Sequence, residues 1–159
     1  MAAYTVILFI FSVQLTLCLC NENDLPNGWG DNIAWHNLQD GLKKSKKQNK
    51  PLMFILHKAW CGACKALKPK FADSEEIGEL SKEFIMVNSP DDQDSKYSPD
   101  GGYIPRILFL DSSGDVMLDF FNEEGNPNYK YYYPAISQVL TSMKNVLQAI
   151  KNKAQNEEL

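Results

Sequence analysis

The sequence is poor in the residues that stabilise small secreted domains or attract nucleic acid. Its 159 residues include four cysteines, and 16 Lys and Arg stand against 20 Asp and Glu, for a formal charge of −4. Small domains stapled by disulfides carry more cysteines than this. A mildly acidic chain of mixed charge offers no basic surface to nucleic acid or to an anionic membrane. We therefore expect neither partner, and a fold that depends on its hydrophobic core.

Charge is also missing from the first twenty residues. Residues 6–17 form an almost unbroken apolar run that is shorter than the roughly 20 residues of a membrane span, and a polar segment follows it. This pattern predicts a secretory signal peptide over residues 1–20, although its beginning lacks the usual Lys or Arg. Cleavage after Cys20 would remove Cys18 and Cys20 and leave no membrane contact. An uncleaved signal anchor, the alternative, fits the short run less well.

The rest of the chain predicts one domain without repeats or internal linkers. Residues 21–32 read as a polar, flexible lead-in, residues 33–152 as the domain, and residues 153–159 as a polar tail. Apolar runs predict strands at 33–35, 52–57, 84–87, 106–110 and 116–121, and the last strand would be one arm of a hairpin. Helical spacing of apolar residues predicts helices at 38–47, from the cysteines onward, at 74–80 and at 136–150. Asn37 would cap the first of these helices. This order predicts an α/β fold: a mixed four- or five-stranded sheet with helices on both faces.

Two cysteines stand where a predicted strand meets a predicted helix. In Trp60-Cys61-Gly62-Ala63-Cys64-Lys65 the thiols are separated by two residues and can close a small disulfide ring. A thiol at a helix N-terminus faces unpaired backbone N–H groups and the positive end of the helix dipole, which favour its thiolate. We therefore assign Cys61 as the attacking nucleophile and Cys64, one turn further on, as the thiol that resolves a mixed disulfide.

The residues around this pair would modulate its chemistry. Lys58 and Lys65 add positive charge near the thiols, whereas Gly62 and Ala63 add none. Trp60 forms either a lid beside the site or part of the core.

Two other interpretations of the cysteines stay open. An inert buried pair is one, but packing alone does not explain two cysteines at this junction. A zinc site is the other, and a closed site needs about four ligands. Only His36 and His57 could supply the remainder, and neither has paired ligand spacing. We expect no metal.

The residues 60–65 resemble the active site of the thioredoxin superfamily. Pro69 falls where that superfamily has a helix kink, and Ile104-Pro105, just before a predicted strand, matches its cis-proline. In the superfamily, this proline lies against the dithiol, and the backbone of the preceding residue pairs with an extended substrate segment. The resemblance thus implies a substrate edge formed by Trp60, Ile104 and Pro105.

Three longer stretches, 50–53, 57–71 and 98–111, narrow the resemblance. They are similar to the branch of small endoplasmic-reticulum proteins that includes thioredoxin domain-containing protein 12 and is related to the anterior gradient proteins. The resemblance covers essentially the whole predicted mature chain. It implies thiol–disulfide exchange on protein substrates, as a glutathione-linked reductase or oxidase. It also implies a monomer with no bound cofactor and with glutathione as its redox partner.

The chain departs from the thioredoxin pattern beside the dithiol. Thioredoxins carry a buried acid in the strand before the site, and this position is Ile55 here. The proton relay assigned to that acid must be absent or replaced by His57, Lys58 or water. Ala63 stands where thioredoxins have proline and disulfide isomerases have histidine, so a strongly reducing potential does not follow from the resemblance.

The C-terminus and the long loops bear on location and on an alternative function. Residues 156–159, Asn-Glu-Glu-Leu, resemble the Lys-Asp-Glu-Leu retrieval signal in their last residues, which favours the endoplasmic-reticulum lumen over secretion. The polar loops 88–103 and 122–133 are long enough to be functional. They suggest a client-binding or chaperone-like module of the anterior gradient type, although a pure binder would not need both cysteines.

Overall fold

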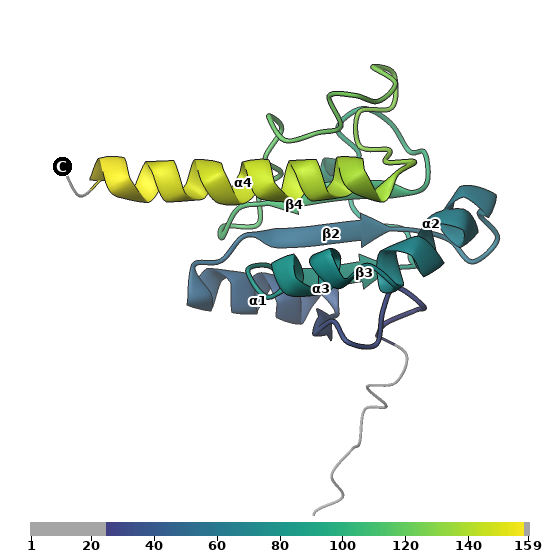
Figure 1. The fold of residues 1–159 in the computed structure, drawn as a ribbon, viewed down its shortest axis with the longest axis horizontal. Helices are drawn as coiled ribbons and strands as arrows, with labels where there is room; N and C mark the ends of the chain where they lie inside the picture. The colour runs from purple at the N-terminus through teal and green to yellow at the C-terminus, as the bar shows by residue number, and fades with distance from the viewer. Residues whose placement is uncertain (1–24, 158–159) are drawn as a thin grey trace, which may run out of the picture.

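The computed structural model describes residues 25–157, so the predicted signal peptide and the last two residues lie outside the described part. A four-stranded sheet in the order β1-β3-β2-β4 forms the centre of the domain (Figure 1). β1, β3 and β2 run parallel, and β4 runs antiparallel to β2. The strands are β1 (Trp35–His36), β2 (Leu52–Leu56), β3 (Ile85–Ser89) and β4 (Arg106–Leu110). The mixed sheet confirms the predicted fold class, with four strands.

Helices cover both faces of this sheet. They are α1 (Leu38–Gln48), α2 (Gly62–Ala72), α3 (Glu75–Ser81), α4 (Ile136–Glu157) and the short 3₁₀ turn η2 (Ser95–Tyr97). Because side chains alternate along a strand, Met53 and Ile55 of β2 pack on the side of α2, α3 and α4. Phe54 faces the other side, with Leu38 and Leu42 of α1. Among residues 25–157, no helix combines the length and apolar character needed to cross a membrane.

Several helix boundaries follow from side-chain caps that the sequence displays. Asn37 accepts the backbone N–H of Asp40 and begins α1 as predicted. Glycine is unfavourable inside a helix, yet Gly41 lies within α1, where it is buried and a Cβ would collide with Val87 of β3. The glycine therefore lets α1 approach the sheet closely. In α4, the helix continues past the expected end at Ile150.

The predicted strand 116–121 is wrong. Only Val116 pairs with β4, through an isolated bridge to Leu110, and the chain then turns at Met117. The outer edge of β4 is instead used by another segment, because the backbone N–H of Ile107 donates to the carbonyl of Tyr131 at 2.9 Å. With this edge position already paired, residues 118–121 have no ladder to join.

The segment before β1 contributes to the core. Trp29, in the stretch that the sequence suggests is a lead-in, is fully buried. Its ring packs edge-on against Phe71 of α2, with centroids 5.5 Å apart. Asn27 and the carbonyl of Leu25 are hydrogen bonded to the Asn88 side chain of β3. Residues 25–30 thus pack beside the carboxyl ends of β2 and β3, where α2 begins.

Candidate active site

The dithiol lies at the carboxyl end of β2, where the chain turns into α2 (Figure 1). Cys61 has an extended backbone and caps the helix: its Sγ accepts the backbone N–H of Cys64 at 3.2 Å. The thiol therefore meets the unpaired N–H groups at the helix start, as the sequence predicts. The Ile104–Pro105 peptide bond is cis, also as predicted, and the Ile104 carbonyl lies 3.6 Å from the Cys61 Sγ.

The two sulfurs occupy different environments. Both cysteines are free thiols. Cys64 is completely buried, whereas 6% of the Cys61 surface is exposed to solvent. Burial, followed by the hydrogen bond with Cys61, raises the pKa of Cys64 to about 12, while the backbone N–H of Lys58 and the charge of Lys68 oppose the rise. Cys64 is therefore a protonated thiol at neutral pH, and Cys61 is the thiol with access to solvent. This asymmetry is what the predicted roles require.

The predicted modulating residues around Cys61 are mostly exposed. Trp60 keeps 76% of its surface exposed, so it is not part of the core. Gly62 and Lys65 are exposed in the first turn of α2, and Ala63 is half-buried. A Cβ at Gly62 would meet nothing within 4 Å. The surface beside the nucleophile is therefore open to a large partner.

The candidates to replace the buried acid lie in two different settings. Ile55 is fully buried. His57 is also buried; its Nε2 lies 3.1 Å from Asn88 Oδ1, which also accepts the side-chain N–H of Asn27. The proton is thus assigned to Nε2, and Nδ1 has no hydrogen-bond partner. Burial lowers the pKa of His57. Lys58 is half-buried and forms a 2.7 Å ion pair with the exposed Asp92.

Lys68 is a residue near the dithiol that the sequence reasoning missed. It follows Cys64 by four positions on α2, and residues at this spacing lie on the same helix face. Its charge interacts with both cysteines. The signal was present in the sequence as this spacing, but three lysines on one helix gave no reason to select it.

A buried arginine organises the backbone next to the cis-proline. Arg106 follows Pro105 and is only 4% exposed. Its guanidinium donates to the carbonyls of Tyr97 and Tyr103 and to the Ser98 hydroxyl. Since these acceptors lie along the loop before Pro105, a single side chain holds the loop that carries the cis-proline.

The two long polar loops are joined to each other. The Tyr103 hydroxyl donates to Asp100 Oδ2 at 2.6 Å, and the backbone N–H of Lys130 donates to the same oxygen at 2.8 Å. We call residues 90–103 and 122–133 the paired loops. The backbone N–H of Tyr131 also donates to the Tyr103 hydroxyl at 2.9 Å, so the two loops are held together near the cis-proline.

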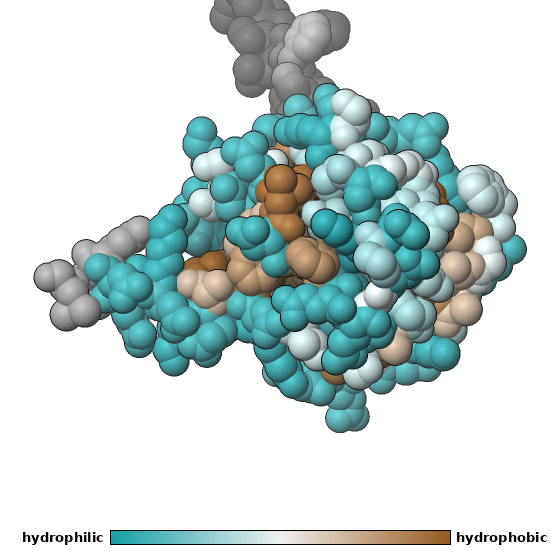
Figure 2. Space-filling view, turned by 90° about the horizontal axis from the view of Figure 1, so that it is seen from above, coloured by the Kyte–Doolittle hydropathy of each residue, from teal (hydrophilic) through white to brown (hydrophobic). Residues whose placement is uncertain are grey.

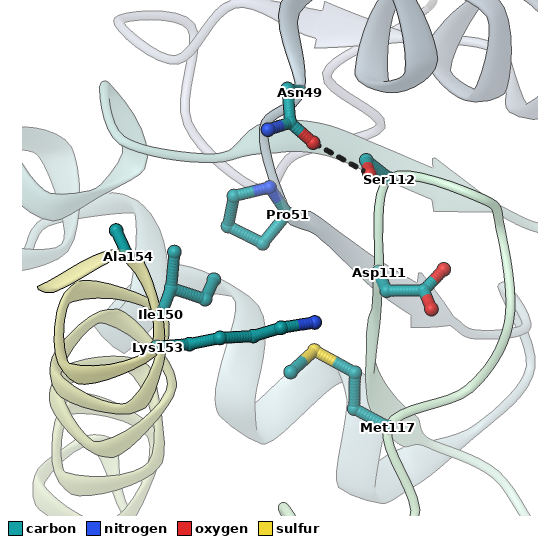
Figure 3. A pocket seen from close by; sticks show the side chains of 8 residues that line it. All are labelled: Asn49, Pro51, Asp111, Ser112, Met117, Ile150, Lys153 and Ala154. Carbon is teal, nitrogen blue, oxygen red and sulfur yellow. Dashed lines mark hydrogen bonds between the residues drawn. The ribbon is translucent and has the colours of Figure 1, made fainter. Parts of the chain in front are cut away.

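Other surface features lie away from the dithiol. A pocket of about 400 Å³ is lined by Pro51 before β2, Asp111 after β4 and Lys153 of α4, so it lies at the opposite end of β2 from Cys61 (Figure 3). The face seen in Figure 2 is mainly hydrophilic, with a small apolar area. Within residues 25–157, no three His, Cys, Asp or Glu side chains gather into a possible metal site.

Comparison with known proteins agrees with this architecture. A thioredoxin-like family model matches residues 34–112. Anterior gradient protein 3 of Mus musculus is 37% identical over 158 residues, covering 95% of this chain and 96% of that protein. Anterior gradient protein 2 homolog of Homo sapiens is 38% identical over 131 residues, which cover 81% of this chain and 75% of that protein. A solved structure of a DsbH oxidoreductase superposes with a TM-score of 0.49 at 18% identity, and the match covers 73% of this chain and 88% of that one. The chain is a thioredoxin-like protein and belongs to the anterior gradient protein family.

Proposed function

We propose that this protein is a thiol–disulfide oxidoreductase that exchanges disulfides with proteins in the endoplasmic-reticulum lumen, with glutathione as its redox partner. The observation that carries the proposal is the position of the Cys61 Sγ. It caps α2, accepts the Cys64 N–H and lies 3.6 Å from the Ile104 carbonyl. A thiol at a helix start beside a backbone carbonyl that can pair with a substrate strand has the parts needed for exchange.

The exchange runs in two displacements. The Cys61 thiolate attacks one sulfur of a substrate disulfide; a mixed disulfide forms, and the other substrate sulfur leaves as a thiolate that takes a proton from water. Cys64 then loses its proton and attacks the Cys61 Sγ. The Cys61–Cys64 disulfide forms, and the second substrate thiolate leaves. Two electrons pass from the dithiol to the substrate, and two glutathione molecules return the protein to the dithiol by the reverse chemistry.

The surface around Cys61 supports a protein substrate rather than a small molecule. Trp60 is exposed beside the nucleophile, and Ile104 is half-buried on the other side. An extended segment could stack on Trp60 and pair with the backbone at Ile104. The predicted signal peptide and the retrieval-like C-terminus support the lumenal location. The resemblance to thioredoxin domain-containing protein 12 supports glutathione linkage and a monomer.

Trapping of mixed disulfides tests this function. In a chain carrying Cys18→Ser and Cys20→Ser, Cys64→Ser removes the resolving thiol and should accumulate a covalent adduct with a protein disulfide substrate. Cys61→Ser should form far less, because the remaining thiol is buried with a pKa of about 12. Adducts are counted on non-reducing gels with and without dithiothreitol. Equal trapping by both variants, or none by either, would contradict the assignment.

A client-binding module with little net catalysis is the second candidate. The paired loops favour it, because Asp100 joins them by accepting bonds from both Tyr103 and Lys130. A joined surface loses less conformational freedom when it binds a partner than two separate loops would. The two candidates separate in the double variant Cys61→Ser, Cys64→Ser. If client binding is the main function, this variant keeps its affinity for an unfolded protein. If thiol–disulfide exchange is the main function, the variant loses it completely, because both thiols are gone.

A further inference from the structure

The resolving cysteine must lose its proton before it can attack, and its surroundings make this unfavourable. Cys64 is fully buried. The groups that act on its ionisation are Cys61, which opposes the thiolate, and the Lys58 N–H and the Lys68 side chain, which favour it. In a mixed disulfide, Cys61 no longer carries a thiol, so its opposition disappears. Burial then disfavours the Cys64 thiolate, and the Lys58 backbone N–H and the Lys68 charge favour it.

Lys68 is held in place by the segment before β1. Its Nζ lies 5.7 Å from the centre of the Trp29 ring, a cation–π distance. Its Cδ lies 3.7 Å from the point where a Cβ on Gly28 would be, so the aliphatic stem crosses this exposed glycine closely. Trp29 is fixed in turn, because it is fully buried between Phe71 and His57.

Lys68 differs from the other lysines of α2. Lys65 and Lys70 are exposed, whereas Lys68 is half-buried. Among the ion pairs of the described residues, none includes Lys68. A charge in partly dry surroundings without a carboxylate partner acts more strongly on its neighbours than a solvated or paired one.

We propose that Lys68 is a positioning residue for disulfide resolution: its ammonium, held over Trp29, stabilises the thiolate that Cys64 forms when it attacks the mixed disulfide. This deepens the proposed oxidoreductase function and rests on it. The S–H proton passes to water, the Cys64 electron pair forms the new S–S bond to Cys61, and the substrate sulfur leaves with the electrons of the broken bond. Because Ile55 stands where thioredoxins have the acid, the proton goes to water, and the fixed cation stabilises the thiolate that remains.

The charged and titratable groups facing this site come from three segments. Lys68 belongs to α2 and Cys61 caps its start, and His57 and Lys58 belong to the turn before it. Asp91, after β3, acts on His57. Burial lowers the pKa of both His57 and Lys68. Lys58 is already paired with Asp92, so its side-chain charge is partly neutralised, and the Lys68 charge is the one left to act on Cys64.

The test measures the resolution step in the full chain carrying Cys18→Ser and Cys20→Ser. The reduced protein reacts with excess glutathione disulfide and is acid-quenched over time between pH 6 and 9. Mass spectrometry then counts the glutathionylated intermediate and the internal disulfide. At these pH values the resolution rate is proportional to the thiolate fraction of Cys64. Lys68→Met should slow resolution roughly three- to tenfold at each pH, the loss expected from removing one nearby charge.

Two variants control the interpretation. Lys70→Met removes an exposed lysine from the same helix and should resolve at the wild-type rate, and Lys68→Arg keeps the charge and should recover most of the rate. Equal resolution rates in Lys68→Met and Lys70→Met would overturn the role of Lys68, while leaving the oxidoreductase function intact. If the wild-type chain forms neither the glutathionylated intermediate nor the internal disulfide, the oxidoreductase function itself fails. Urea unfolding of each variant shows that the compared proteins are folded.

Discussion

The buried histidine beside the dithiol should make the domain sensitive to mild acid. His57 is 2% exposed, and its Nε2 is bonded to Asn88 Oδ1. Burial disfavours the imidazolium, and so the pKa of His57 is lowered in the native state. In the unfolded chain, a histidine titrates near 6.5. Below that pH, the unfolded state takes up a proton that the native state refuses, so the free energy of unfolding falls as the pH falls.

The size of the effect follows from the single proton involved. Between the unfolded and native pKa values, the free energy of unfolding should fall by at most ~1.4 kcal/mol per pH unit. Two carboxyl groups whose pKa is lowered, Asp40 by its hydrogen bond with Asn37 and Asp92 by Lys58, lose their native partners only at more acidic pH. The window from about pH 6.5 to 5 therefore lies above the titration of these carboxyl groups, and substitution of each histidine separates their contributions.

Urea unfolding at several pH values measures this slope. The reduced protein is unfolded at pH 7.5, 6.5, 5.5 and 5.0 and followed by tryptophan fluorescence. His57→Gln removes the titrating ring but keeps an amide able to donate to Asn88, and it should flatten the pH dependence. His36→Gln, which changes the other histidine, leaves the buried ring and its slope in place. If wild type and His57→Gln lose stability in parallel, the buried-histidine argument is refuted.

Four further substitutions test individual features of the structure. Trp60→Ala should leave the free energy of unfolding within about 0.5 kcal/mol of wild type but slow exchange with protein disulfides more than with glutathione disulfide, because the contact that we propose for the exposed ring is with a large substrate. Arg106→Lys should cost about 1–3 kcal/mol and speed amide exchange in residues 95–103, since lysine cannot reach all three acceptors; unchanged exchange would contradict the loop-holding role. Gly41→Ala should destabilise by about 1–3 kcal/mol by pressing on Val87, whereas Gly62→Ala, with open space around it, should be near neutral; urea unfolding compares the two.

The fold could be predicted where sequence signals are local. The apolar run before the cysteines became β2, the predicted cap at Asn37 became the start of α1, and the predicted helix 74–80 became α3. The strand-to-helix junction placed Cys61 at the start of α2 as expected. These features depend on alternation, capping and the spacing of a few neighbouring residues.

The errors and omissions arose where distant segments compete or meet. The predicted strand 116–121 does not form, and the carbonyl of Tyr131, from a later loop, accepts the Ile107 N–H at the β4 edge. Nothing in the polar sequence around Trp29 indicates that its ring packs against Phe71 and makes a cation–π contact with Lys68. The importance of Lys68 depends on that long-range contact, so the sequence alone could not separate it from its exposed neighbours.

The central claim is that Cys61 and Cys64 form one reversible redox pair, and its most direct test is equilibrium with glutathione. The chain carrying Cys18→Ser and Cys20→Ser is equilibrated over a range of reduced-to-oxidised glutathione ratios, acid-quenched and analysed by mass spectrometry. We predict one two-electron transition between dithiol and internal disulfide, with a midpoint between about −270 and −120 mV, the range of this class. A chain that stays a dithiol throughout, or that collects only glutathione adducts, would contradict the claim.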